Sequence, residues 1–353
     1  MSISPNPEFR FVPRWQTAVP VASAEQTPPA PSVATAAPRI ELRSSRSGKY
    51  LDVGFRYSLL ICSASILAVM GLFFYELTTR SRLSIARFGF SFFVGNTWDP
   101  VSGDFGALPF IYGTLVSSLL ALVLAVPMAV GVAVFVTELC PRFLRGIISY
   151  TVELLAAIPS VIYGLWGIFV LVPILHKYVQ PWLGHYLGWT GLFGGPAYGI
   201  GMLAAGIILA IMIVPIIASI TREVLVAVPQ SQREAVLALG ATRWEMVRMA
   251  VLRNARAGIM GGIILGLGRA LGETMAVTML IGNRPEIARS LFAPGYTMAS
   301  VIANEFSEAT GDLYLSALVE IGLALLIVTV IVNGCARLLM WSITRGYSAR
   351  SNA

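Results

Sequence analysis

Long apolar runs alternate with short polar stretches along most of the chain. Six of these runs carry few or no charged residues and reach the length of about 20 residues that an α-helix needs to cross a bilayer. The predicted spans cover residues 57–77, 111–136, 147–175, 198–220, 258–282 and 313–339. The pattern therefore predicts an all-α integral membrane protein with six transmembrane helices, within a membrane domain over residues 55–345.

Proline lies inside three of the predicted spans, as Pro127, as Pro159 with Pro173, and as Pro215. Proline removes one backbone donor, but neighbouring helices in a membrane can satisfy the freed carbonyl groups. We therefore expect these prolines to kink their helices rather than to interrupt them.

Residues 1–50 differ from the rest of the chain. They hold eight of the 20 prolines, together with many alanines, serines and threonines, and no apolar run of signal-peptide length. Such a composition buries too little apolar surface to fold. The segment is predicted to be a disordered cytoplasmic tail rather than a cleaved leader.

Composition agrees with a membrane protein. The chain is 56% hydrophobic and 12% charged, against about 25% charged residues in ordinary soluble domains. The net charge of +7 arises from residues dispersed between the apolar runs, which indicates membrane topology rather than nucleic-acid binding. Three scattered cysteines and two lone histidines do not have the spacing of a metal site.

The basic residues predict the orientation of the chain. With the N-terminus in the cytoplasm, 18 of the 25 Lys and Arg residues lie inside and six outside, and Arg269 lies within the membrane. This bias follows the positive-inside rule. Both termini are therefore expected in the cytoplasm, as an even number of helices requires.

The longest predicted cytoplasmic loop, residues 222–257, contains two helix-start patterns. Ser231 to Glu234 and Thr242 to Glu245 both have the spacing of a capping box. Gly240 lies between them and suits a left-handed helix end. Two short helices are expected to meet at a Gly240 elbow. Capping alone is one interpretation of Glu234.

The fifth predicted span contains two charges, Arg269 and Glu273, on one helical face. A charge at the membrane centre costs about 2.5–3.5 kcal/mol on insertion scales. The pair either neutralises itself and fixes helix packing, or lines a translocation path on which the guanidinium binds an oxyanion. Glycines repeat at spacing four in this span (258, 262, 266) and predict close helix packing.

Two groups of motifs carry a family resemblance. Glu234-Ala235-Val236, Gly240 and Val251-Leu252 resemble the EAA loop of ABC importer permeases, although Val236, Ala250 and Arg253 depart from the usual pattern. The stretches 153–167 and 266–283 are similar to those of PstC-type permease subunits of bacterial phosphate importers. The resemblance covers roughly residues 55–345.

This resemblance implies a type I ABC importer permease fold that passes inorganic phosphate along a path containing Arg269 and Glu273. It implies that Glu234, Ala235 and Gly240 contact an ATPase. The implied partners are a second permease subunit, two ATPase subunits that bind ATP and Mg²⁺, and an extracytoplasmic phosphate-binding protein, all at the bacterial inner membrane. The chain has no P-loop motif. It is therefore expected to bind no cofactor and to catalyse no reaction by itself.

Three alternatives stay open. The chain could pass another oxyanion, such as sulfate or molybdate. It could be a secondary anion transporter, for which inverted repeats and broken midplane helices are typical. It could be an intramembrane enzyme acting on lipid phosphates, although no nucleophile and base are recognisable. Two further acids, Glu153 near the cytoplasmic end of its span and Glu320 near the outer end, could serve packing or the path.

Overall fold

A computed structural model describes the backbone of residues 46–348 and the side chains of residues 53–342. The chain divides into two compact units, and the boundary falls after Ser63, inside helix α1 (Arg46–Arg80). Residues 1–45 of the predicted disordered tail lie outside the described residues. The prediction is wrong for residues 46–50, which are helical and belong to α1. This stretch contains no proline, so the helix can extend by more than one turn beyond the apolar run.

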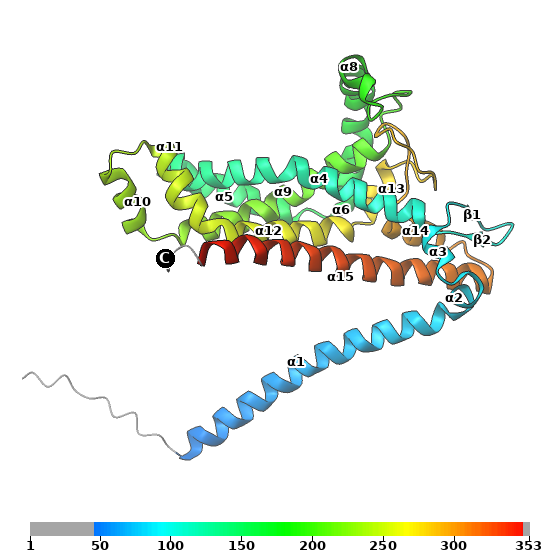
Figure 1. The fold of residues 1–353 in the computed structure, drawn as a ribbon, viewed down its shortest axis with the longest axis horizontal. Helices are drawn as coiled ribbons and strands as arrows, with labels where there is room; N and C mark the ends of the chain where they lie inside the picture. Colours follow the sequence, from blue (N-terminus) through cyan, green and yellow to red (C-terminus); the bar gives the residue numbers. More distant parts are fainter. Residues whose placement is uncertain (1–45, 349–353) are drawn as a thin grey trace, which may run out of the picture. The chain divides into compact units, whose positions relative to one another are not determined.

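The other elements all belong to the second unit, and nearly all are helices (Figure 1). Before the third apolar run these are α2 (Arg82–Phe88), α3 (Ser91–Val94), the antiparallel pair β1 (Trp98–Asp99) and β2 (Asp104–Phe105), α4 (Leu108–Val134), the π-helical η1 (Phe135–Leu139) and α5 (Arg142–Ala157). The third run holds α6 (Ser160–Trp166), π-helical η2 (Gly167–Leu171), α7 (Val172–Ile174), π-helical η3 (Leu175–Val179), α8 (Gln180–Leu187) and η4 (Gly188–Thr190). The remainder comprises α9 (Met202–Val226), α10 (Gln230–Ala238), α11 (Arg243–Met246), π-helical η5 (Val247–Val251), α12 (Leu252–Leu271), α13 (Met275–Leu280), α14 (Met298–Glu305) and α15 (Asp312–Ser348).

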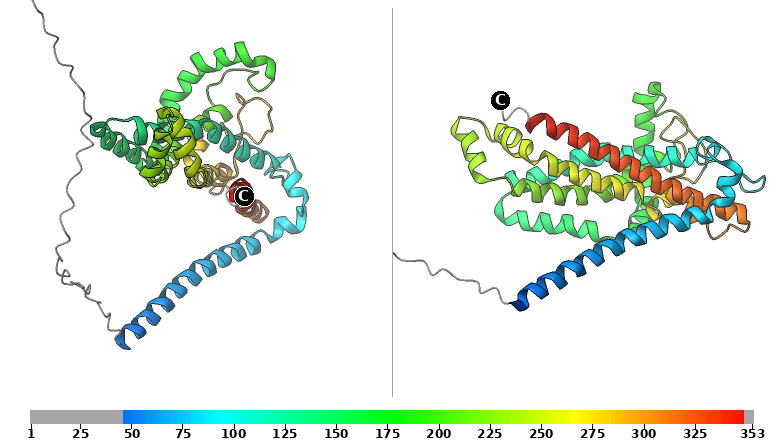
Figure 2. Two further views of the ribbon diagram at one scale, coloured as in Figure 1. Left: turned by 60° about the vertical axis from the view of Figure 1, so that its left-hand side comes forward. Right: turned by 60° about the horizontal axis from the view of Figure 1, so that its bottom comes forward.

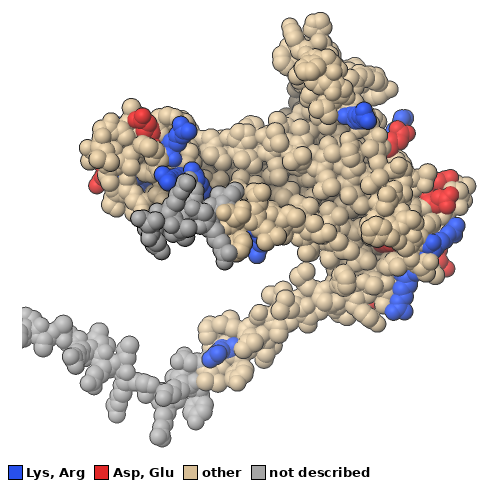
Figure 3. All heavy atoms as spheres, viewed as in Figure 1, with Lys and Arg blue, Asp and Glu red and all other residues tan. Residues whose placement is uncertain are grey.

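Within the described part of the chain, six helical stretches are long and apolar enough to cross a membrane. They are Val53–Arg80, Leu108–Leu139, Ser160–Thr190, Met202–Val226, Arg243–Leu271 and Asp312–Ser342. In Figure 3, most charged side chains visible on the second unit lie towards the ends of its long helices, and the surface between them is almost free of charge. The prediction of an all-α membrane protein with six spanning helices is confirmed.

The core of the second unit forms where α4 and α12 pack on α9, with α5 also against α9 and α15 against α12 (Figures 1 and 2). Small residues bring these helices close together. Ala121, Ala125 and Ala129 of α4 are fully buried. A Cβ atom at Gly258 or Gly266 of α12 would lie within 3 Å of a side chain of α9. The close packing predicted from the glycine repeat is therefore confirmed.

Two glycines of α4 give a matched test of this packing. A Cβ at Gly113 would lie 2.1 Å from the carbonyl oxygen of Tyr296, whereas a Cβ at Gly131 would meet nothing within 4 Å. Because backbone atoms cannot yield as a side chain does, Gly113→Ala is expected to destabilise the protein by about 1–3 kcal/mol. Gly131→Ala should leave stability unchanged or raise it by up to about 1 kcal/mol. Thermal unfolding of the full-length protein in detergent measures both, and equal melting temperatures would contradict the packing.

The third span predicted as one helix, 147–175, is broken in the structure. α5 ends at Ala157, and α6 begins after Pro159. Pro159 has no N–H for the Leu155 carbonyl, which instead accepts hydrogen bonds from the Tyr163 hydroxyl at 2.8 Å and from the Ile158 N–H at 3.4 Å. These two bonds satisfy the carbonyl where the chain leaves the helix at Ile158. Pro127 and Pro215, by contrast, lie inside uninterrupted helices, as predicted.

The fifth predicted span, 258–282, is also broken, and its second part packs against the broken third span. α12 ends at Leu271, and α13 starts at Met275. α13 then contacts α6, where Gly164 lies against Ala276 and Met279, and η2, where Gly167 lies against Leu280. The stretches 153–167 and 266–283, which resemble those of PstC-type permeases, therefore meet in space through the parts that follow their helix breaks.

Candidate functional site

The predicted charged pair lies at the second helix break. Arg269 belongs to the last turn of α12, while Glu273 follows the end of that helix. The prediction that both lie on one continuous helix is therefore wrong, because the helix ends at Leu271. The structure nevertheless brings the two side chains together, with Arg269 Nη2 3.6 Å from Glu273 Oε2.

The two partners differ in their surroundings. The Glu273 side chain is 4% exposed, and the Arg269 side chain is 46% exposed. The second carboxylate oxygen of Glu273 accepts a long hydrogen bond of 3.4 Å from the Ala276 N–H. Both distances exceed the about 2.7–2.9 Å of a strong charged hydrogen bond. The buried carboxylate therefore neutralises the guanidinium loosely and leaves its donors accessible.

Arg269 lines an open groove of about 740 Å³ between α9, α12 and α15. Most of the groove is apolar, and α12 and α15 form its long walls. Its polar lining comes from Arg269, Thr329, Asn333 and Arg337. Both charged residues of this lining are arginines, so the groove favours a negatively charged ligand.

The residues of α15 in this groove were missed as site candidates from the sequence. Arg337 was counted only as a basic residue of the cytoplasmic end. Thr329, Asn333 and Arg337 recur every fourth position in residues 321–341 of α15, a stretch that is otherwise apolar, and this spacing places them on one face. Among the described residues, Asn333 Oδ1 is buried without a hydrogen-bond partner. A polar stripe in a membrane helix was the signal that could have identified them.

The elbow predicted in the cytoplasmic loop is present. Gly240 has a φ of +85° and separates α10 from α11. The second predicted capping box is confirmed. Glu245 N–H donates to the Thr242 hydroxyl, and the Glu245 carboxylate accepts from Thr242 N–H at 2.8 Å.

The first predicted capping box is wrong. α10 begins at Gln230, one residue before Ser231, because Pro229 fixes the backbone angle that starts the helix. Ser231 therefore lies inside the first turn and caps nothing, and Glu234 does not reach back to it. Capping does not explain Glu234.

Glu234 and Ala235 are exposed on α10. The surface around them carries large apolar side chains, since Leu239 is 88% and Trp244 64% exposed. Exposed apolar residues at a polar end of a membrane protein are typical of a protein contact. Contact of Glu234, Ala235 and Gly240 with an ATPase stays a prediction.

The two remaining acids do not join the charged pair. Glu153 lies 3.0 Å from Arg222 at the same end of the helices as α10, and its side chain is 55% exposed. Glu320 is 1% exposed, and its Oε2 has no hydrogen-bond partner among the described residues. Neither lines the groove that holds Arg269.

These features define a polytopic membrane permease with an accessible arginine in its membrane region and a helical elbow at one end. Residues 125–343 match the family described as "Binding-protein-dependent transport system inner membrane component", and the chain belongs to this family. It is therefore a multi-pass inner-membrane permease subunit of the ABC transporter class.

Within the family, the chain is similar to proteins named phosphate transport system permease protein PstC. It is 50% identical to that of Mesorhizobium japonicum over 79% of this chain and 86% of the relative. It is 48% identical to that of Pasteurella multocida over 74% of this chain and 83% of the relative. The resemblance to PstC-type permeases seen in the sequence is confirmed.

The fold also matches a solved structure. A chain from a bacterial ABC transporter involved in the import of the acidic polysaccharide alginate superimposes with a TM-score of 0.54. The match is 17% identical in sequence and covers 82% of this chain and 98% of that chain. At this identity the match supports the importer-permease fold and carries no information on substrate.

Proposed function

We propose that this chain is the PstC-type permease subunit of an ATP-driven importer that moves inorganic phosphate into the cytoplasm. The main evidence for the proposed phosphate path is the half-exposed guanidinium of Arg269, which lies in a largely apolar groove. The identity of up to 50% with proteins named phosphate transport permeases supports phosphate as the substrate.

Arg269 is the residue proposed to contact phosphate. A guanidinium can donate two parallel hydrogen bonds to one oxyanion. Glu273 holds Arg269 only at 3.6 Å, so an incoming phosphate can displace the carboxylate without breaking a strong bond. The same carboxylate neutralises the guanidinium when the site is empty, which keeps the affinity low enough for release.

The proposed partners supply what this chain lacks. They are a second permease subunit, two ATPase subunits that bind ATP and Mg²⁺, and an extracytoplasmic phosphate-binding protein. The exposed elbow around Gly240 is proposed to contact an ATPase, with both termini of the chain in the cytoplasm. ATP binding closes the ATPase pair, the elbow moves, and the path opens outward. Phosphate then passes Arg269, and ATP hydrolysis resets the complex.

Reconstitution of the whole complex in vesicles tests this proposal. Radiolabelled phosphate should accumulate only when ATP and the phosphate-binding protein are both present, and sulfate and molybdate should not compete. Uptake of sulfate or molybdate in preference to phosphate would instead favour the alternative substrate. Phosphate movement by this chain alone, without nucleotide, would overturn the proposal.

Helix breaks do not argue for a secondary transporter here. Broken membrane helices are typical of such transporters, and this chain has two of them, at residues 158–159 and 272–274. The family match nevertheless places the chain among the permeases of binding-protein-dependent transporters. A broken helix therefore marks a site in the membrane. It does not tell whether ATP or an ion gradient drives transport.

A further inference from the structure

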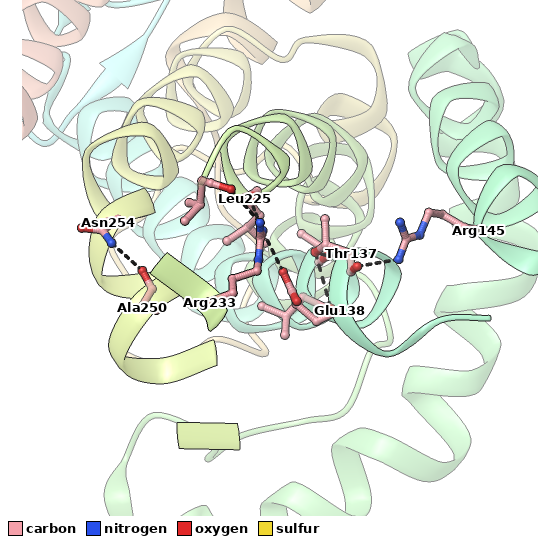
Figure 4. Close-up of polar contacts among 10 residues, drawn as sticks. Thr137, Glu138, Arg145, Leu225, Arg233, Ala250 and Asn254 are labelled. Atoms are coloured by element: carbon pink, nitrogen blue, oxygen red, sulfur yellow. Dashed lines mark hydrogen bonds and ion pairs between the residues drawn. The ribbon is translucent and has the colours of Figure 1, made fainter. Parts of the chain in front are cut away.

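The short helix α10 is bound to the membrane helices by one arginine. Arg233 Nη1 donates to the Val228 carbonyl at 2.6 Å, and Arg233 Nη2 donates to the Leu225 carbonyl at 2.8 Å. Arg233 Nη2 also lies 3.1 Å from Glu138 Oε1 (Figure 4). One side chain thus joins α10 to the end of α9 and to η1, which continues α4.

These contacts satisfy groups that a helix end leaves open. α9 ends at Val226, where the Leu225 carbonyl accepts from the Val228 N–H only at 3.3 Å and keeps room for a further donor. An arginine can hydrogen-bond these carbonyl groups, and its positive charge suits the negative end of the helix. The planar guanidinium suits this arrangement because it presents several donors in a fixed geometry.

The pair formed by Arg233 and Glu138 is largely, though not fully, buried. The side chains are 14% and 11% exposed, whereas the nearby pair of Arg222 and Glu153 is 28% and 55% exposed. A buried ion pair is screened less by water and salt than an exposed one. The contact with Glu138 is therefore a firm connection between α10 and the end of the α4 helix.

A second contact joins α10 to the start of α12. The amide nitrogen of Asn254 donates to Gln232 Oε1 at 2.6 Å. It also donates to the Ala250 carbonyl at 2.8 Å (Figure 4). Glu138 lies in η1, and Ala250 lies in η5. Both are π-helical stretches, which are frequent at functional positions in helices. α10 is thus fixed to three membrane helices: to α4 through η1, to the end of α9, and to the start of α12.

We infer that Arg233 is the positioning residue that makes α10 move as one body with the ends of α4 and α9. The backbone between α9 and α10 is only Ala227–Pro229. Without Arg233, a displacement of α10 would bend this connector and would not move the end of α9. This inference rests on the proposed importer function, in which an ATPase pushes on the elbow. Arg233 contacts neither phosphate nor nucleotide in this proposal.

The test compares Arg233→Gln with Arg222→Gln in the complete complex, because both arginines pair with a glutamate at the same end of the helices. Phosphate imported per ATP hydrolysed is the measured quantity. For Arg233→Gln this ratio should fall about tenfold or more while ATP hydrolysis stays within about twofold of the unsubstituted complex. For Arg222→Gln the ratio should stay within about twofold. An unchanged ratio in Arg233→Gln would overturn the inference.

A chemical rescue separates transmission from simple loss of structure. Gln232→Cys and Asn254→Cys, introduced into Arg233→Gln after removal of the native cysteines, can be joined by a short thiol-reactive cross-linker. Joining them should raise the ratio above that of the same variant before cross-linking, because it ties α10 covalently to the start of α12, at the position of the hydrogen bond between Asn254 and Gln232. If Arg233→Gln fails to assemble, Glu138→Gln is measured instead, because it removes only the charge. Its expected ratio lies between those of the two arginine variants.

Two results keep this inference separate from the proposed function. Absence of ATP-driven phosphate uptake in the unsubstituted complex contradicts the proposed function. Normal uptake in the unsubstituted complex, with an unchanged ratio in Arg233→Gln, or in Glu138→Gln where Arg233→Gln does not assemble, contradicts the role of Arg233 alone. Failure of the cross-link to raise the ratio contradicts transmission through α10 and leaves only a structural role.

Discussion

Arg269→Gln is expected to abolish phosphate uptake by the assembled importer. Glutamine keeps a polar amide but is shorter than arginine, and it removes the charge and the paired donors of the guanidinium. Each hydrogen bond to a charged group is worth about 1.5–3 kcal/mol, so losing two of them should slow transport by at least about 100-fold. Uptake of radiolabelled phosphate in vesicles measures the effect, and size-exclusion chromatography checks that the complex assembles.

Arg269→Lys is the matched control for charge. Lysine keeps the positive charge but cannot donate two parallel hydrogen bonds in a fixed plane. Uptake should therefore lie between that of the unsubstituted complex and that of Arg269→Gln. Normal uptake by Arg269→Gln would contradict the path role and would favour the other interpretation, in which Arg269 and Glu273 only fix helix packing.

The number of membrane helices and the positions of four of them followed from the sequence, because each depends on the hydropathy of one segment alone. The third and fifth spanning stretches, Ser160–Thr190 and Arg243–Leu271, are displaced from the predicted 147–175 and 258–282. The two helix breaks depended on contacts between residues at different positions. Pro159 looks like Pro127 and Pro215 in the sequence, yet only near Pro159 does a tyrosine hydroxyl, that of Tyr163, take over the freed carbonyl. Such replacement partners appear only once the chain has folded.

Only those parts of the candidate site that depend on local sequence could be predicted. The cost of a charge in the membrane was sufficient to single out Arg269 and Glu273. The end of α12 between them, and the groove shared with Asn333 of α15, required the packing of helices distant in sequence. In the elbow, Gly240 and the capping box at Thr242 were local signals and were predicted correctly. The anchoring by Arg233 involves Glu138, which is 95 residues away.

Gly240→Val is expected to uncouple ATP hydrolysis from transport. Gly240 has a φ of +85°, which a β-branched residue adopts only with strain. Such a conformation costs about 1–3 kcal/mol, and a bias of this size changes the populations of two conformations by about 5–150-fold. ATP hydrolysis should continue while the phosphate imported per ATP falls by about tenfold or more.

Gly240→Asn separates backbone strain from side-chain bulk. A Cβ at Gly240 would meet nothing within 4 Å, so added volume alone should cost little within this chain. Asparagine enters the left-handed region far more readily than valine. Gly240→Asn should therefore keep most of the coupling that Gly240→Val loses. Equal loss in both variants would mean that the side chain itself blocks the contact with the ATPase, and normal coupling in both would mean that the elbow does not transmit the motion.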